Sequence, residues 1–321
     1  MPHATTLPPG TVQANINYYN ETLYGPKGKV WLYMAAHQRR QIFDPRVMPI
    51  ADIRDTNEDF DVDTSGFKLV TFPQLEIPLE DDRECIMKQV WPVAEEVYKK
   101  HTGATSVQIF SHTIRNEPHQ TFEDIRNSDD PDDKLIVKEH PAMLAHCGKP
   151  FREWFQSGAN TLTDQSYKGG YYIMDDYKVN RQDSGSLEAL EKKCQSRWAI
   201  VNLWKPLKPI TREPLAVCDA RSVDESDLSP NISRVPAELH PSGKCRDSEY
   251  WQVVANDKHK WYWASNMGTD EAWLIKCFDT KVNGVARRAL HTAFQTPNDH
   301  GPPRISIEFR AFVFWEDQER E

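Results

Sequence analysis

Short runs rich in aromatic and β-branched residues place the strongest constraint on how this chain folds. Beyond residue 106 such runs follow one another, each bounded by Gly, Pro, Asn or Asp. Runs of this composition, separated by turn residues, are typical of β-strands. They read VQIFSHTIR, GYYIMDDY, WAIVNLW, PLAVCD, YWQVVA, KWYWAS, WLIKCFD and RISIEFRAFVFW. The series predicts a mainly β protein, built as a barrel or a two-sheet jelly roll.

Two helices are expected to flank this β core. From residue 81 to 103, apolar residues recur at helical spacing, acids lie at the start, lysines lie near the end, and Gly103 follows. Pro92 predicts a kink in this helix. A second helix is expected to begin at Ser186. We therefore expect an extension of strands and one long helix over residues 1–105, packed on a β domain that spans residues 106–321.

The charge and the apolar content of the chain narrow the partners it can have. The net charge is -9, and no run of Lys or Arg is long enough to neutralise a row of phosphates, which argues against nucleic acid. No stretch approaches the roughly 18 apolar residues of a membrane span, and no secretion signal opens the chain. The six cysteines form no CxxC pair, as expected of reduced thiols. We expect a cytoplasmic protein that binds a small molecule or another protein.

The last run places two kinds of side chain on opposite faces of one strand, because successive side chains alternate. One face is apolar and the other is polar: Ile305, Ile307, Phe309, Ala311 and Val313 share the first, and Arg304, Ser306, Glu308 and Arg310 share the second. Arg304 and Ser306 are able to converge on one carboxylate. A solvent-facing strand edge would give the same pattern, and the spacing does not decide between the two.

A metal site is a further possibility that these runs raise. His291 precedes Arg304 by enough residues for a turn and re-entry on a neighbouring strand, and Asp176 would add a carboxylate from an earlier strand. Two His and a carboxylate on one face of a barrel form the facial triad that holds Fe(II). Because alternate residues of a strand point the same way, the second His is expected two residues before Asp176. Met174 occupies that position.

Several motifs are long enough to compare with known families: RWAIVNLWKPL, EPLAVCDARSV, WYWASNM, DEAWLIKCFDT, GVARRALHTAFQTP and PPRISIEFRAFVF. With ANINYY and FSHTIR, they resemble a fungal and bacterial group of Fe(II)/2-oxoglutarate-dependent oxygenases. The group includes gibberellin desaturase-like, aspergillic acid hydroxylase-like and cephamycin methoxylation proteins. The resemblance covers most of the chain and is strongest from Arg197 to Phe314. It implies a double-stranded β-helix, a cupin-like jelly roll, with flanking helices.

The resemblance also implies roles for individual residues. The family's His-x-Asp falls on Met174 and Asp176, its distal His on His291, and its Arg-x-Ser on Arg304 and Ser306, which would bind the 2-oxoglutarate carboxylate. Met174 departs from the pattern, and a thioether is a weak, soft ligand where a neutral imidazole is a good one for Fe(II). We therefore expect Asp176 and His291 to form a weak or vestigial metal site. Fe(II) and 2-oxoglutarate are then bound weakly or not at all.

These points predict a catalytically degenerate homologue that is the partner subunit of a heterodimeric oxygenase in secondary-metabolite biosynthesis. Some relatives in fungal meroterpenoid pathways resemble such a pair, so the expected partner is a homologous catalytic subunit. The alternative is an active Fe(II)/2-oxoglutarate-dependent hydroxylase or desaturase of a secondary metabolite. In that alternative Asp176 and His291 bind the metal and Arg304 holds the co-substrate. The missing ligand would come from Asp175, turned inward through a register shift, or from His112 on a neighbouring strand. A small-molecule binding protein of the same fold is the third possibility.

Overall fold

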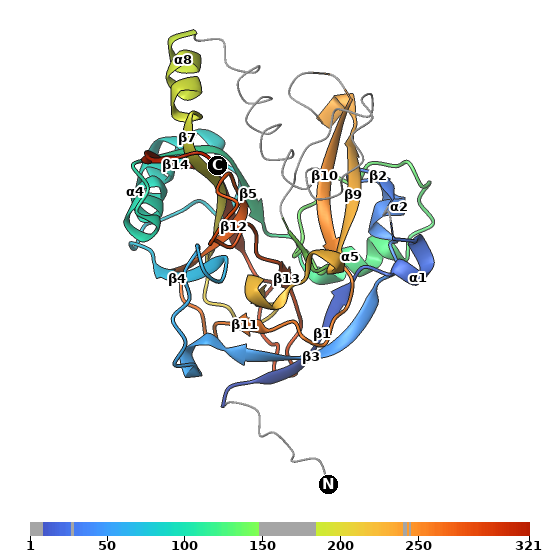
Figure 1. The fold of residues 1–321 in the computed structure, drawn as a ribbon. Helices are drawn as coiled ribbons and strands as arrows, with labels where there is room; N and C mark the ends of the chain where they lie inside the picture. Colours follow the sequence, from blue (N-terminus) through green and yellow to red (C-terminus); the bar gives the residue numbers. More distant parts are fainter. Residues whose placement is uncertain (1–8, 27–28, 148–183, 240–242, 244) are drawn as a thin grey trace.

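Two β-sheets face each other in this computed structural model, which describes residues 9–26, 29–147, 184–239, 243 and 245–321 (Figure 1). The larger sheet has the strand order β1-β3-β11-β8-β13-β6-β10-β9-β2, and the smaller has the order β4-β12-β7-β14-β5. Most neighbouring strands are antiparallel, and the exceptions are β11 with β3 and β2 with β9. The expected mainly β jelly roll is therefore confirmed.

The bounds of the strands follow the sheet order. The larger sheet contains β1 (Val12–Tyr18), β3 (Asp44–Asp52), β11 (Trp261–Trp263), β8 (Leu215–Cys218), β13 (His291–Ala293), β6 (His146–Cys147), β10 (Arg246–Val253), β9 (Leu228–Val235) and β2 (Val30–Leu32). The smaller contains β4 (Phe67–Thr71), β12 (Glu271–Asp279), β7 (Ser196–Pro206), β14 (Ser306–Glu319) and β5 (Ser106–Arg115). Both sheets thus include strands from the stretch before residue 106, and the division at residue 105 stays a prediction.

Most of the predicted strands are present, and two of the strands missed by the sequence, β3 and β9, contain proline. Proline within a run normally argues against a strand, because it donates no backbone hydrogen bond. Nevertheless β3 pairs with β1 from Asp44 to Ile50, with Pro49 opposite Gln13. Likewise Pro230 in β9 lies opposite Trp251 in β10. The predicted run GYYIMDDY lies outside the described residues.

The helices lie at the periphery of the sheets (Figure 1). They are α1 (Glu21–Tyr24), α2 (Ala36–Arg39), α3 (Arg83–Cys85), α4 (Trp91–Thr102), α5 (His119–Arg126) and α8 (Ser184–Lys193). Within the part of the chain that the structure describes, no helix has the length and apolar content that crossing a bilayer requires. The helix expected from Ser186 is confirmed as α8.

The long helix expected before Gly103 is present but is interrupted where a kink was predicted. A π-helical turn over Ile86–Val90 joins α3 to α4, and Pro92 lies in the first turn of α4. Because proline has no N–H to donate, it is tolerated at such a start. Gly103 then ends α4 in the left-handed conformation, with φ +67.

Helix α4 covers the outer face of the smaller sheet and forms the main apolar core with it. Its Ala94, Val97 and Tyr98 pack against the face of β14 that carries Ile307 and Phe309. The buried Tyr98 hydroxyl hydrogen-bonds to the carbonyl oxygens of Val201 and Phe309, at 3.0 Å each. The apolar face predicted for the last strand is therefore the helix-facing side of the sheet.

A buried ion cluster joins β7 to β12 at one end of the smaller sheet. The fully buried Asp279 carboxylate accepts from Arg197 Nη2 and from Lys276 Nζ, both at 2.7 Å. Asp63 supplies a second carboxylate, 2.7 Å from Arg197 Nη2. Opposite charges compensate one another here, so removal of one partner leaves a buried charge unpaired.

The substitution Asp279→Asn keeps the size of this side chain and removes its charge. We expect it to lower the free energy of unfolding by about 3 kcal/mol, because Arg197 and Lys276 then share one partly exposed carboxylate. Urea denaturation measures the change. The matched control is Asp132→Asn, since Asp132 is 82% exposed in its pair with Arg40; it should cost less than about 0.5 kcal/mol. Equal losses in the two variants would contradict the role of burial.

Lys205 is another buried cation, but it has no carboxylate within hydrogen-bond distance among the described residues. Its Nζ donates to the Pro206 carbonyl at 3.2 Å and lies 4.8 Å from the centre of the Phe72 ring. Burial lowers its pKa from 10.5 to about 8. The folded state therefore disfavours the protonated amine.

We expect Lys205→Met to stabilise the protein by about 1–2 kcal/mol at pH 7. Because the folded-state pKa lies below the ordinary value, the penalty is complete below pH 8 and is gone above pH 10.5. The gain in stability should therefore disappear between those two pH values. Urea denaturation of both proteins at pH 7, 9 and 10.5 tests this, and a gain that does not change with pH would count against it.

Candidate functional site

The polar face of β14 lies between the two sheets. Ser306 and Glu308 in β14 are 0% and 7% exposed, and Arg304, just before the strand begins, is 5% exposed. β14 is a central strand between β7 and β5. The interpretation of this face as a solvent-facing edge is therefore wrong. Because helix α4 covers the opposite face, these polar side chains point into the interior of the jelly roll.

Two histidines face each other on neighbouring strands of the larger sheet. His291 in β13 lies directly opposite His146 in β6, and their ring centres are 4.5 Å apart. His291 also lies opposite Val217, whose side chain belongs to the core between the sheets. Directly opposite residues share a face, so both imidazoles point toward the interior. The expectation that His291 and Arg304 lie on neighbouring strands is wrong, because β13 and β14 lie in opposite sheets.

The hydrogen bonds of these histidines leave equivalent nitrogens for a ligand. Nδ1 of His146 donates to the Leu144 carbonyl at 2.7 Å, and Nδ1 of His291 donates to the Ala289 carbonyl at 3.3 Å. A backbone carbonyl on Nδ1–H is the usual support of a metal-binding histidine, whose Nε2 then carries the free lone pair. The pair therefore fits two ligands of a metal such as Fe(II).

Burial keeps both imidazoles in the neutral form. Desolvation, with a smaller contribution from His291, lowers the pKa of His146 to about 3. Desolvation also lowers the pKa of His291, although the Glu308 carboxylate opposes the effect. Neutral imidazole is the form that binds metals.

Glu308 and two arginines make up the charged part of the interior. Burial by itself would raise the pKa of Glu308, but the charges of Arg310 and Arg115 overcome it and bring the value to about 2. Arg310 Nη2 lies 2.5 Å from Glu308 Oε1, and Arg310 Nη1 donates to Thr113 Oγ1 at 3.2 Å. Arg115 pairs with the Glu139 carboxylate. These charges are thus matched within the protein.

Arg304 and Ser306 differ because they keep unused donors. Arg304 Nη1 donates to the Glu213 carbonyl at 2.6 Å, and its guanidinium lies 5.1 Å from the centre of the Trp204 ring. Arg304 Nε and Ser306 Oγ are buried and have no hydrogen-bond partner among the described residues. Burial lowers the pKa of Arg304 to about 9, so the guanidinium stays charged at neutral pH. Two buried donors two residues apart suit a carboxylate ligand.

The residues predicted from the sequence fall into three groups. His291, Arg304 and Ser306 come together in the interior, as described above. Met174 and Asp176, together with the alternative Asp175, lie outside the described residues, and their roles remain predictions. His112 points away from the site, toward α4, where Trp91 Nε1 donates to its Nδ1 at 3.2 Å. The suggestion that His112 supplies the missing ligand is therefore wrong.

Sequence reasoning missed His146. Its strand has two residues in this structure, too few for an alternating pattern, and the pairing with His291 joins positions far apart in the chain. Among the described residues no cluster of three or more His, Cys, Asp or Glu side chains would hold a metal ion. The histidine pair thus supplies two ligands of a larger set.

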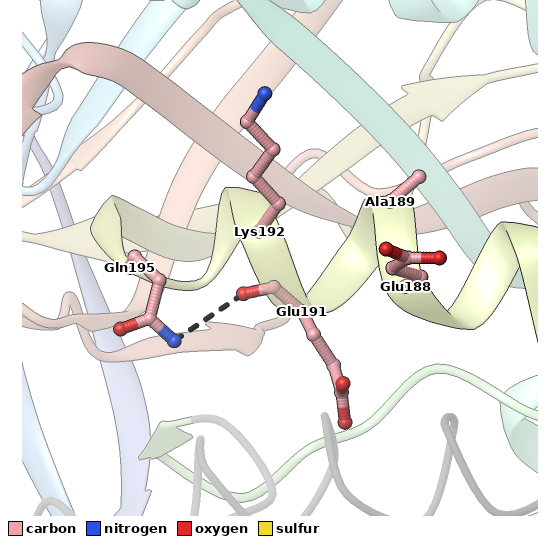
Figure 2. Close-up of a pocket in the computed structure, with 5 residues that line it drawn as sticks. All are labelled: Glu188, Ala189, Glu191, Lys192 and Gln195. Carbon is pink, nitrogen blue, oxygen red and sulfur yellow. Dashed lines mark hydrogen bonds between the residues drawn. The ribbon is translucent and has the colours of Figure 1, made fainter.

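A surface hollow beside α8 is not a candidate site (Figure 2). It is lined by exposed residues of the helix and the turn after it: Glu188, Ala189, Glu191, Lys192 and Gln195. Gln195 Nε2 reaches the Glu191 carbonyl at 3.4 Å, a contact within that segment. No buried polar group converges on the hollow from another element of the described structure, in contrast to the interior site.

Comparisons with known proteins agree with this fold. Residues 16–314 match the family described as oxidoreductase/YMDC permease-like domain. The hydroxylase/desaturase efuI of Hormonema carpetanum is 35% identical, with 97% of each chain covered. The hydroxylase/desaturase CTB9 of Cercospora beticola is 34% identical and covers 95% of this chain and 87% of its own.

A solved structure shares the fold. The iron and α-ketoglutarate-dependent endoperoxidase NvfI superposes with a TM-score of 0.68 at 22% identity, covering 97% of this chain and 99% of its own. At that identity the likeness shows the jelly-roll fold alone. From the match over residues 16–314 and the related hydroxylases and desaturases, the chain belongs to this oxidoreductase family, and its relatives are fungal Fe/2-oxoglutarate-dependent hydroxylases and desaturases.

Proposed function

We propose that this protein is an active Fe(II)/2-oxoglutarate-dependent hydroxylase or desaturase of a fungal secondary metabolite. The observation that carries the proposal is the His146–His291 pair, whose Nδ1 atoms are both occupied by backbone carbonyls. The relatives named hydroxylase/desaturase and α-ketoglutarate-dependent dioxygenase support the class of reaction. Because His146 and His291 already supply two imidazoles, a two-histidine metal site does not need a third at position 174.

Each part of the interior has a task in this proposal. Nε2 of His146 and of His291 would hold the iron, and Arg304 with Ser306 would hold one carboxylate of 2-oxoglutarate. Iron with its co-substrate supplies the activation of O₂ needed to remove hydrogen from an unactivated carbon. The paired charges of Glu308 and Arg310 keep the surroundings neutral, and burial between the sheets excludes water from the reacting groups.

The remaining ligand in this proposal is a carboxylate. The sequence after His146 and before α8 offers several, all outside the described residues: Glu153, Asp164, Asp175, Asp176 and Asp183. Asp176 is the one that the resemblance implies.

The partner-subunit hypothesis rests on Met174, which stands where that resemblance expects a ligand. In that hypothesis the chain binds iron poorly and contributes its surface to a homologous catalytic subunit. The two proposals differ in whether the isolated protein binds iron and is active, so measurements on the isolated protein distinguish them.

The first test concerns the histidine pair. We expect His146→Ala to weaken the binding of Co(II), an air-stable probe for the iron site, by more than the roughly 10- to 100-fold that loss of an outer-sphere support costs. The matched control is His112→Ala, which removes a buried histidine from the helix-facing side of the smaller sheet, away from the site. Absorption titration measures both. Wild-type affinity in His146→Ala would exclude His146 as a ligand.

The second test separates the two proposals. We expect the purified wild-type chain, loaded with Fe(II) without oxygen, to bind near-stoichiometric iron and to form succinate from 2-oxoglutarate on aeration. Met174→Leu should leave both properties unchanged, whereas alanine at the liganding carboxylate, Asp176 or one of the other four carboxylates named above, should abolish them. Iron uptake that appears only in Met174→His would instead support the partner subunit.

A further inference from the structure

Glu213, just before β8, combines a strained backbone with a buried carboxylate that has no hydrogen-bond partner among the described residues. Its φ is +50, a left-handed conformation that costs free energy for any residue other than glycine. The residue is fully buried, and both carboxylate oxygens lack a hydrogen-bond partner among the described residues. Strain and unsatisfied buried groups persist together mainly where function requires them.

The loop that follows β13 holds Glu213 in this conformation. The Glu213 N–H donates to Asp299 Oδ2 at 2.9 Å. On either side, the His300 N–H donates to the Thr211 carbonyl at 3.0 Å and the Phe294 N–H donates to the Pro214 carbonyl at 3.2 Å. The backbone of residues 211–214 is therefore clamped, and the direction of the Glu213 carbonyl is set.

That carbonyl is the acceptor that orients Arg304. It accepts a hydrogen bond from Arg304 Nη1 at 2.6 Å, and the Trp204 ring lies beside the guanidinium. A planar guanidinium fixed at one nitrogen and one face has a single direction left for its remaining donors. Its Nε is among those without a partner, as is Ser306 Oγ.

The Glu213 carboxylate lies close enough to Arg304 to interact electrostatically with its guanidinium, and so acts against an anion bound there. Its Oε1 lies 3.6 Å from Arg212 Nη2, beyond hydrogen-bond distance. A buried negative charge that is only partly compensated disfavours a second negative charge nearby. The carbonyl and the carboxylate of one residue therefore have opposite effects on anion binding.

We propose that Glu213 is the positioning residue of the anion pocket at Arg304: its carbonyl aims the guanidinium, and its carboxylate weakens the hold on any carboxylate ligand. The identity of that ligand, a five-carbon dicarboxylate, rests on the proposed function. An acid that contacts only the Arg304 pocket is then bound weakly. The pocket therefore favours a ligand that also binds the metal.

The test uses the metal-free full-length protein, with 2-oxoglutarate and glutarate titrated by calorimetry. Glu213→Gln removes the charge and keeps the rest of the side chain, so it should tighten the binding of both acids about tenfold, the effect of one partly screened charge. A residue with a merely structural role would not strengthen binding when it is replaced. Unchanged or weaker binding in Glu213→Gln would overturn the role of the carboxylate.

A second pair of variants tests the backbone conformation of residue 213 separately from its carboxylate. Glu213→Gly and Glu213→Val both lack the carboxylate, but glycine adopts φ +50 freely and valine does not. We expect tighter binding than wild type in Glu213→Gly and at least about tenfold weaker binding in Glu213→Val. Equal affinities in these two variants would overturn the positioning role.

Folding and the proposed function are controlled separately. Should circular dichroism show that Glu213→Val does not fold, Asp299→Ala replaces it, because it removes the acceptor of the Glu213 N–H and should weaken binding as well. A protein that binds no iron but shows this pattern of affinities would contradict the proposed function and support the role of Glu213. Absence of binding of either acid to wild type and to Glu213→Gln would overturn this inference.

Discussion

The alternation of side chains along β14 is the constraint on which the rest of the structure depends. This central strand has one apolar face under α4 and one polar face between the sheets. From Ser306 to Phe309 both faces are buried, so the polar one must find its partners inside the protein. The core and the candidate site are thus two sides of one strand, and a one-residue shift in its pairing would exchange them.

The buried charges show which part of the interior is meant for a ligand. Glu308 is matched by Arg310, and Arg115 by Glu139. Arg304 has only a carbonyl as its partner on Nη1, beside the unpartnered hydroxyl of Ser306. Because a protein gains little from burying donors that it does not use, the unmatched group is the one expected to bind an anion.

Features carried by local periodicity could be predicted from the sequence, and features made by long-range pairing could not. The two faces of β14, the helix ending at Gly103 and the strand runs all follow from spacing within one segment. Pro230 concealed β9, because its role depends on the neighbouring strand. The left-handed Glu213 is likewise imposed by contacts with Asp299, far along the chain.

His146 and Met174 illustrate the same limit for the site. The expectation at Met174 assumed that two ligands lie two residues apart on one strand. Directly opposite residues of neighbouring strands are as close, with Cβ atoms about 4.5–5.5 Å apart, and sequence spacing does not reveal them. His146 and His291 are such a pair, brought together by the register of β6 with β13. A methionine at position 174 therefore does not by itself mean that the interior lacks two imidazole ligands.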